Sequence, residues 1–152
     1  MGLPKLEHPT FELEIPSTKE VIKYRPFLVK EEKILLMAQQ SGEPKDFISA
    51  IQQVLNNCMF DYDCTNATNF DTEYMFLKLR ANSVSDLAKI SITDDETNQD
   101  IEIELDLNEI EVPMPEEINN LVQLNDQVSV ELRWPKYQDI LKMEELNDEA
   151  TT

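Results

Sequence analysis

The stretch "YRPFLVKEEKILLMAQ", residues 24–39, marks a change from strand to helix. The overlapping run "VIKYRPF" has a strand-like pattern that ends at Pro26. The following letters, "KEEKILLMAQQS", are strong helix formers with acids early, and Gly42 stands just after them as a plausible stop signal. The stretch therefore predicts a joint between a hairpin and a helix over about residues 29–40.

The same joint carries both aromatic and charged side chains. Because aromatic rings bury much apolar area, we expect Tyr24 and Phe27 to pack under the helix. We expect the basic side chains to pair with nearby acids of the helix or of later strands, which would balance the local charge. The charged residues assigned to this structural joint are Arg25, Lys30, Glu31 and Lys33, with Glu32 as a further possible partner.

Working outward, the preceding run "FELEI", residues 11–15, alternates apolar and acidic side chains and predicts the first strand of an N-terminal β-hairpin. A second helix begins near Pro44 and has the clearest helical spacing of apolar residues in the chain. Those residues are Phe47, Ile48, Ile51, Val54, Leu55, Cys58 and Met59. A third helix follows the loop "DYDCTNATN", with Asp71 as its expected cap.

The third helix has apolar side chains on more than one face. Tyr74, Met75 and Phe76 are consecutive, so they cannot all point in one direction. The pattern favours a helix central to the core and leaves open a helix presented to a partner. These three residues are therefore candidate partner contacts.

From Leu87 onward the hydrophobic period changes to two, which predicts strands. The alternating runs are "KISI", "DIEIELDL", "EIEV" and "QVSVELRW", with "TDDETNQ" and "QLNDQ" as turns. The predicted fold class is α+β, with the hairpin, about three helices, a mainly antiparallel β-sheet and a short C-terminal helix. We expect a single domain over residues 1–140, with its helical half at about 28–86 and its β half at about 87–134. Residues 141–152 are polar and predict a frayed tail.

The net charge is -18, and residues 86–152 contribute -15 of it, with nineteen acidic and four basic side chains. A surface this acidic repels phosphates and anionic lipids, so we expect neither nucleic acid nor membrane as a partner. The row Glu102, Glu104 and Asp106 alternates with apolar residues. It predicts a solvated strand face, or a docking surface for a basic protein.

The sequence offers few groups for chemistry. His8 is the single histidine, Gly2 and Gly42 are the only glycines, and no phosphate-binding or dinucleotide motif is present. We therefore expect no enzyme, no cofactor and no small-molecule substrate. Asp61, Asp63, Asn66 and Asp71 lie close together in the sequence, but their spacing does not match a calcium loop, so no metal is expected either. Cys58 and Cys64 are expected to be reduced thiols.

The chain lacks an apolar run of about 20 residues and a secretory leader, so we expect a soluble intracellular protein. The order "PTFELEIPSTKEVIKYRPFLVKEEKILLMA", then "NNCMFDYD", then "FDTEYMFLKLRANSVSD" resembles the baseplate hub assembly proteins of T4-like contractile-tailed bacteriophages. This resemblance covers about residues 6–86 and continues more loosely to "WPKYQDIL". Some members of that family carry a zinc-knuckle-like cysteine arrangement where this chain has "TDDETNQ", which speaks against a metal here.

The resemblance implies a non-enzymatic assembly factor, or chaperone, for the central hub of the tail baseplate. Such a protein acts by contact with other hub proteins in the host cytoplasm during phage assembly. A permanent structural subunit of the baseplate in the virion tail is the alternative. A further alternative, suggested by the acidic segment, is a decoy that binds a basic host protein. The sequence leaves open the oligomeric state and whether this chain is a short or truncated relative.

Overall fold

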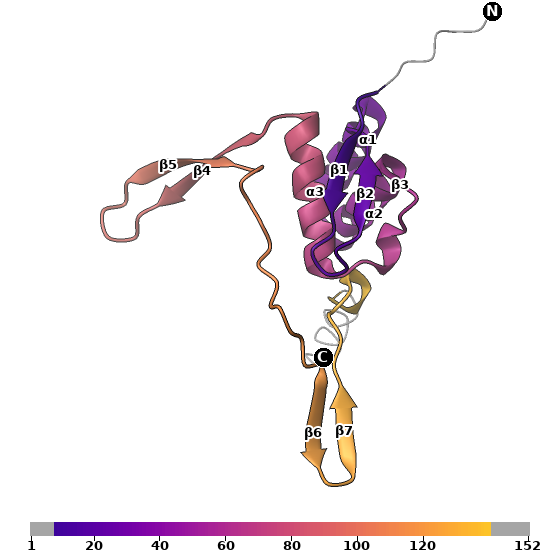
Figure 1. The fold of residues 1–152 in the computed structure, drawn as a ribbon. Coiled ribbons are helices and arrows are strands. Elements are labelled where there is room, and N and C mark those ends of the chain that lie inside the picture. Colours follow the sequence, from indigo (N-terminus) through magenta and orange to yellow (C-terminus); the bar gives the residue numbers. More distant parts are fainter. Residues whose placement is uncertain (1–7, 141–152) are drawn as a thin grey trace, which may run out of the picture.

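The first half of the chain folds into a small sheet packed against helices, and the second half extends away from it as two hairpins (Figure 1). The structure is a computed structural model that describes residues 8–140. The sheet contains three antiparallel strands in the order β1-β2-β3, with bounds Phe11–Glu14, Val21–Tyr24 and Met59–Phe60. In β1 and β2, Leu13 lies opposite Ile22, and both side chains are buried.

Three α-helices complete this half: α1 (Val29–Ser41), α2 (Pro44–Cys58) and α3 (Asn69–Ser83). A short 3-10 helix, η1 (Cys64–Asn66), lies between β3 and α3. Helix α1 ends at Gly42, whose φ of 72° is a left-handed conformation that glycine adopts without a steric cost. The hairpin, the joint and all three helices therefore follow the sequence prediction.

The core lies between the sheet and the inner faces of α2 and α3. It combines Ile22 and Tyr24 from the sheet with Val54 and Leu55 from α2 and Met75 from α3. Among the described residues, Leu107 is the only buried hydrophobic residue beyond position 81. The second half therefore adds almost nothing to this core.

The start of α3 differs from the prediction that Asp71 caps it. Thr68 is the cap, and its hydroxyl oxygen accepts a hydrogen bond from the backbone N–H of Asp71 at 3.3 Å. The buried carboxylate of Asp71 instead accepts hydrogen bonds from the Thr68 hydroxyl at 2.6 Å and from the backbone N–H of Ser17 at 3.0 Å. Asp71 thus ties the β1–β2 turn to the helix, a long-range contact that local sequence does not reveal.

The second half contains four strands: β4 (Leu87–Thr93), β5 (Asp100–Asp106), β6 (Leu121–Asn125) and β7 (Val128–Glu131). They form two separate two-stranded antiparallel ladders, β4-β5 and β6-β7. Residues 137–140 are helical at the end of the described part. The α+β class is thus confirmed, with the strands of this half in two ladders rather than one continuous sheet.

One predicted strand was wrong. The alternating run "EIEV", residues 109–112, belongs to no strand, whereas residues 121–125, partly predicted as a turn, form β6. Pro113 and Pro115 lack the N–H groups that a ladder needs, and they follow "EIEV" directly. The segment instead runs as an extended connection from β5 to β6, beside the first half of the molecule (Figure 1). The predicted tail at 141–152 lies outside the described residues.

Candidate protein-binding surface

Two hairpin arms project from the first half of the molecule (Figure 1). We call residues 87–106 the first arm and residues 120–134 the second arm. The first arm leaves the C-terminal end of α3, and the second arm joins the chain beside the N-terminal end of the same helix (Figure 1). Helix α3 has 15 residues, which corresponds to a length of about 22 Å at 1.5 Å per residue. One helix therefore separates the two arm bases.

The first arm has one apolar face. Strand β4 pairs with β5 in a register that places Ile90 opposite Ile103 and Ile92 opposite Ile101. Because side chains alternate between faces along a strand, these four residues share a face with the Ala88 and Leu105 pair. Ile92 is 50% exposed and Ile101 is 52% exposed. The apolar face thus lies open to solvent along its length.

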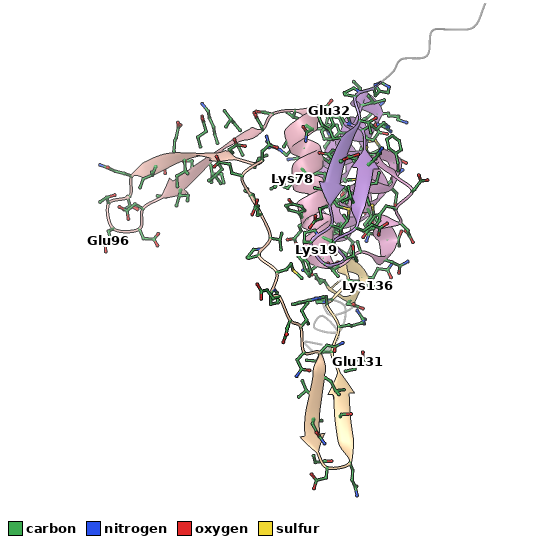
Figure 2. All side chains as sticks on the ribbon, viewed as in Figure 1. Lys19, Glu32, Lys78, Glu96, Glu131 and Lys136 are labelled. Atoms are coloured by element: carbon green, nitrogen blue, oxygen red, sulfur yellow. The ribbon has the colours of Figure 1, made fainter. Side chains whose placement is uncertain are left out.

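The opposite face and the tip of the first arm are acidic. Glu102 and Glu104 lie opposite Ser91 and Lys89, on the face away from the isoleucines. Both glutamates are exposed, and Lys89 approaches Glu104 at 3.9 Å. Figure 2 shows side chains standing out from both faces of this arm, with Glu96 at its tip. The predicted solvated acidic face is therefore present, on a strand whose other face is equally uncovered.

The tip turn is built by its own side chains. The Asp94 carboxylate accepts hydrogen bonds from the Thr97 hydroxyl at 2.6 Å and from the backbone N–H of Glu96 at 3.1 Å. The hydrogen bond from Thr97, with that from Glu96, lowers the pKa of the Asp94 carboxyl. Both bonds form between residues of the turn itself, so the turn is stabilised locally.

The base of the first arm is anchored by a buried lysine. The Lys78 ammonium donates hydrogen bonds to the carbonyl oxygens of Leu107 at 3.0 Å and Asn108 at 2.7 Å. The backbone N–H of Leu107 donates to the carbonyl oxygen of Asp86 at 2.7 Å, which closes the hairpin. Burial lowers the pKa of Lys78, against the opposing effect of nearby acids. In Figure 2, Lys78 lies on α3, on the side that faces the connection between the arms.

The second arm is also a two-stranded antiparallel hairpin, with less charge and with a register shift between Gln123 and Asn125. Val122 lies opposite Val130, and Leu124 and Val128 follow two positions farther along, toward the tip. All residues of β6 and β7 are exposed. In the tip turn, the Asn125 side-chain oxygen accepts hydrogen bonds from the backbone N–H groups of Gln127 and Val128, both at 2.9 Å. A second apolar face is therefore open to solvent.

An aromatic contact anchors the base of the second arm. Trp134 packs edge-on against Phe70 of α3, with ring centroids 5.4 Å apart. Beside it, the backbone N–H of Asn69 donates to the carbonyl oxygen of Pro135 at 3.0 Å. A groove of about 560 Å³ lies at this base. Its lining is Ile118, Asn119, Asn120, Leu132, Arg133, Trp134 and Pro135.

A scan against protein-family models gives the decisive comparison. The model described as T4 bacteriophage base plate protein matches residues 8–152, nearly the whole chain. The chain belongs to the T4 bacteriophage base plate protein family. The resemblance identified from the sequence is thereby confirmed at the family level. Comparisons of this baseplate protein with curated proteins and with solved structures give no match.

In this baseplate protein, the candidate contact residues of α3 are turned at least partly toward the core. Met75 is completely buried in the core, and Tyr74 and Phe76 are half-buried and packed against it. Of the candidate contacts on β5, Glu102 and Glu104 are exposed, and Asp106 is half-buried. The structure thus places the three acids on β5 and the other three residues on α3. Lys78 lies between the two groups, since it interacts electrostatically with Asp106 and lies 5.2 Å from the centroid of the Tyr74 ring.

The joint residues gather around one buried carboxylate. Glu31 is 0% exposed, and one of its oxygens accepts a hydrogen bond from the Arg25 guanidinium at 3.0 Å while Lys30 approaches at 3.3 Å. Tyr24 is buried, and Phe27 packs against the core. The last member, Lys33, is exposed and forms no ion pair with any residue in the described part.

The Arg25 guanidinium also donates to the carbonyl oxygens of Pro26 and Asn57, each at 2.9 Å. The other Glu31 oxygen accepts from the backbone N–H of Leu28 at 2.9 Å. Burial opposes ionisation, but the hydrogen bonds from Arg25 and Leu28 outweigh it and lower the pKa of Glu31. The joint therefore links β2, α1 and the end of α2 through a satisfied ion pair.

Both cysteines lie in the core of the first half. Cys58 and Cys64 are free and buried, and burial raises the pKa of the Cys58 thiol to about 11 and that of Cys64 to about 12. Both sulfurs are therefore protonated near pH 7 and poor nucleophiles. Over the described range, no helix has the length and apolarity of a membrane span. Sequence reasoning missed the open apolar faces, although the isoleucine alternation was the signal that marked them.

Proposed function

We propose that this baseplate protein is a non-enzymatic assembly factor for the central hub of the tail baseplate. It acts by binding other hub proteins through its two arms. The observation that carries the proposal is that both arms present an apolar face that no described part of the chain covers. Membership of a baseplate family supports partners among baseplate proteins.

The physical support comes from the cost of leaving such faces in water. Burying a whole isoleucine or leucine side chain contributes roughly 1.5–3 kcal/mol, so covering a half-exposed one contributes about half as much. Several such residues follow one another along each arm. Isolated two-stranded hairpins are also marginally stable in water, so a partner that covers them stabilises the arms as well.

The absence of catalysis is part of this proposal. Its support is the chemistry of the described residues, in which both thiols are protonated and His8 stands exposed ahead of β1. Catalysis needs several convergent groups, and the arms offer carboxylates on a solvated face instead.

Co-expression with each hub protein of the same baseplate, followed by size-exclusion chromatography, tests the proposal. We expect co-elution with at least one hub protein. A matched variant carries Ile90→Thr, Ile103→Thr, Val122→Thr and Val130→Thr, since threonine retains the β-branched shape that strands prefer. This variant is expected to elute alone. Normal hub formation without the protein, together with no complex, would refute the assembly role.

A permanent structural subunit is the second candidate. The open apolar faces favour it too, because permanent interfaces are more hydrophobic than transient ones. Quantitative mass spectrometry of purified virions separates the two. An assembly factor is absent or substoichiometric there, whereas a subunit is present in a fixed copy number.

A further inference from the structure

The two arms differ sharply in charge although both are two-stranded antiparallel hairpins. The first arm, residues 87–106, has seven acidic side chains and one lysine, whereas the second arm, residues 120–134, has two acidic side chains and one arginine. The seven acids are Asp94, Asp95, Glu96, Asp100, Glu102, Glu104 and Asp106. Their concentration on one projecting hairpin distinguishes its binding chemistry from that of the second arm.

Most of these carboxylates form no ion pair within the described residues, although Asp106 interacts electrostatically with Lys78 of α3. Within the part of the chain that the structure describes, the only ion pair of the first arm is Lys89 with Glu104, at 3.9 Å. Both members are well exposed, so the pair contributes little. The negative charge of the arm is therefore available to a partner.

The arm is also narrow enough for both faces to act together. Neighbouring strands lie about 4.8 Å apart, so the acidic side chains are a short distance from the edges of the apolar face. The Debye length is about 8–10 Å at 0.1–0.15 M salt. Basic side chains at the rim of a groove that holds the isoleucines would therefore feel the charges on Glu102, Glu104 and the tip.

We infer that the first arm docks with its apolar face in an apolar groove of a different protein, a groove rimmed by lysine or arginine side chains. This inference rests on the proposed function and deepens it by naming the chemistry of one partner surface. The isoleucine face supplies most of the affinity through burial, and the carboxylates supply salt-dependent attraction and orientation.

Charge argues against the other occupants of this face. A second copy of the chain would bring together two acidic arms on two molecules of net charge -18 each. The chain's own segment 141–152 carries four acidic side chains and one lysine, so it is repelled as well. A basic partner protein is the occupant that complements the arm.

The test measures binding to the hub proteins of the same baseplate, expressed one at a time, by biolayer interferometry at 50, 150 and 500 mM NaCl. Ile90→Thr with Ile103→Thr is expected to weaken binding about tenfold or more at every salt concentration. Glu102→Gln with Glu104→Gln is expected to weaken binding at 50 mM and to flatten its dependence on salt. The second pair of substitutions leaves the apolar face untouched.

Matched controls use equal changes elsewhere. Glu116→Gln with Glu117→Gln removes two exposed charges from the connection between the arms and should leave the salt dependence unchanged. The inference is overturned, and the proposed function left intact, if the unaltered chain binds a hub protein with an affinity that does not depend on salt and both first-arm variants bind equally well. The inference is also overturned if the unaltered chain associates with itself and the Ile90→Thr, Ile103→Thr variant does not. No binding to any hub protein overturns both.

Discussion

At the scale of single residues, the pair of Arg25 and the fully buried Glu31 connects several elements of the first half. The pair joins the end of β2 to the start of α1, and a further hydrogen bond from Arg25 to Asn57 reaches the end of α2. A buried ion pair contributes little relative to an apolar replacement, but removing one partner leaves an uncompensated charge. The fold therefore depends on keeping both members.

Arg25→Met tests this dependence. We expect the free energy of unfolding, measured with urea at pH 7, to fall by about 3–5 kcal/mol, because Glu31 remains buried and loses its strongest hydrogen-bond donor. Lys23→Met is the matched control, since Lys23 forms an exposed pair with Glu12 at 3.6 Å. That change should cost at most about 1 kcal/mol. Equal losses in both variants would contradict a special role for Arg25.

The pH dependence of stability gives a second test at this scale. The pKa of Glu31 is lowered in the folded protein, so its stabilising contribution is fully present above the unfolded value of about 4.3. That contribution is lost as the pH falls below 4.3 and through the folded pKa. Glu31→Gln should therefore lower the unfolding free energy at pH 7 and lower it less at pH 3. A difference between wild type and variant that stays constant over this range would be inconsistent with the lowered pKa.

At the scale of elements, the arms and the helical half have different sources of stability. The helical half has a continuous core, whereas the arms are held by strand pairing, their turns and the contacts at their bases. Hairpins of two strands are marginal by themselves. We therefore expect amides of the arms to exchange with solvent faster than amides of α2 and α3.

Lys78→Met probes the base of the first arm. The change keeps an unbranched side chain of similar length but removes the donor to the carbonyls of Leu107 and Asn108, of which the bond to Leu107 is buried. The rates of amide hydrogen exchange should rise by roughly tenfold across residues 87–107, with a smaller change in α2. Lys89→Met, on the exposed face of the same arm, should leave the exchange pattern unchanged. Unaltered exchange in Lys78→Met would show that the arm is held by other contacts.

Some of the elements could be predicted from local sequence patterns and others could not. The hairpin, the joint and the three helices follow from periodicity and stop signals because their patterns are local. The pairing of β6 with β7 was missed, because "EIEV" alternates as regularly as a true strand. Pro113 and Pro115 disfavour strand pairing of "EIEV". The tight turn at Asn125 instead places residues 121–125 beside β7, with which they pair.

At the scale of the whole molecule, the sequence predicts two-faced strands but not what covers each face. Alternation of isoleucine with acids is typical of a sheet with one face on a core. Here the arms project away from the core, so the apolar faces of both arms are uncovered (Figure 1). Whether an apolar face meets the chain's own core or another protein depends on long-range geometry. The same reason explains Met75, which the sequence left open between core and partner and the structure buries.

The arrangement of the arms on α3 suits a protein that is completed by its partners. Their bases lie near the two ends of one helix of about 22 Å, anchored by Lys78 and by Trp134. With one arm strongly acidic and the other nearly neutral, the two can engage different surfaces at the same time. Such simultaneous contacts raise the overall affinity through the high effective concentration of the second site.

Hydrogen exchange of the protein with and without the hub proteins that we propose as its partners tests the central claim most directly. The account predicts that complex formation protects residues 87–106 and 120–134, with little change in α2, because the partners cover the open faces of the arms. A complex in which both arms continue to exchange freely while protection appears over α1 or α3 would contradict it.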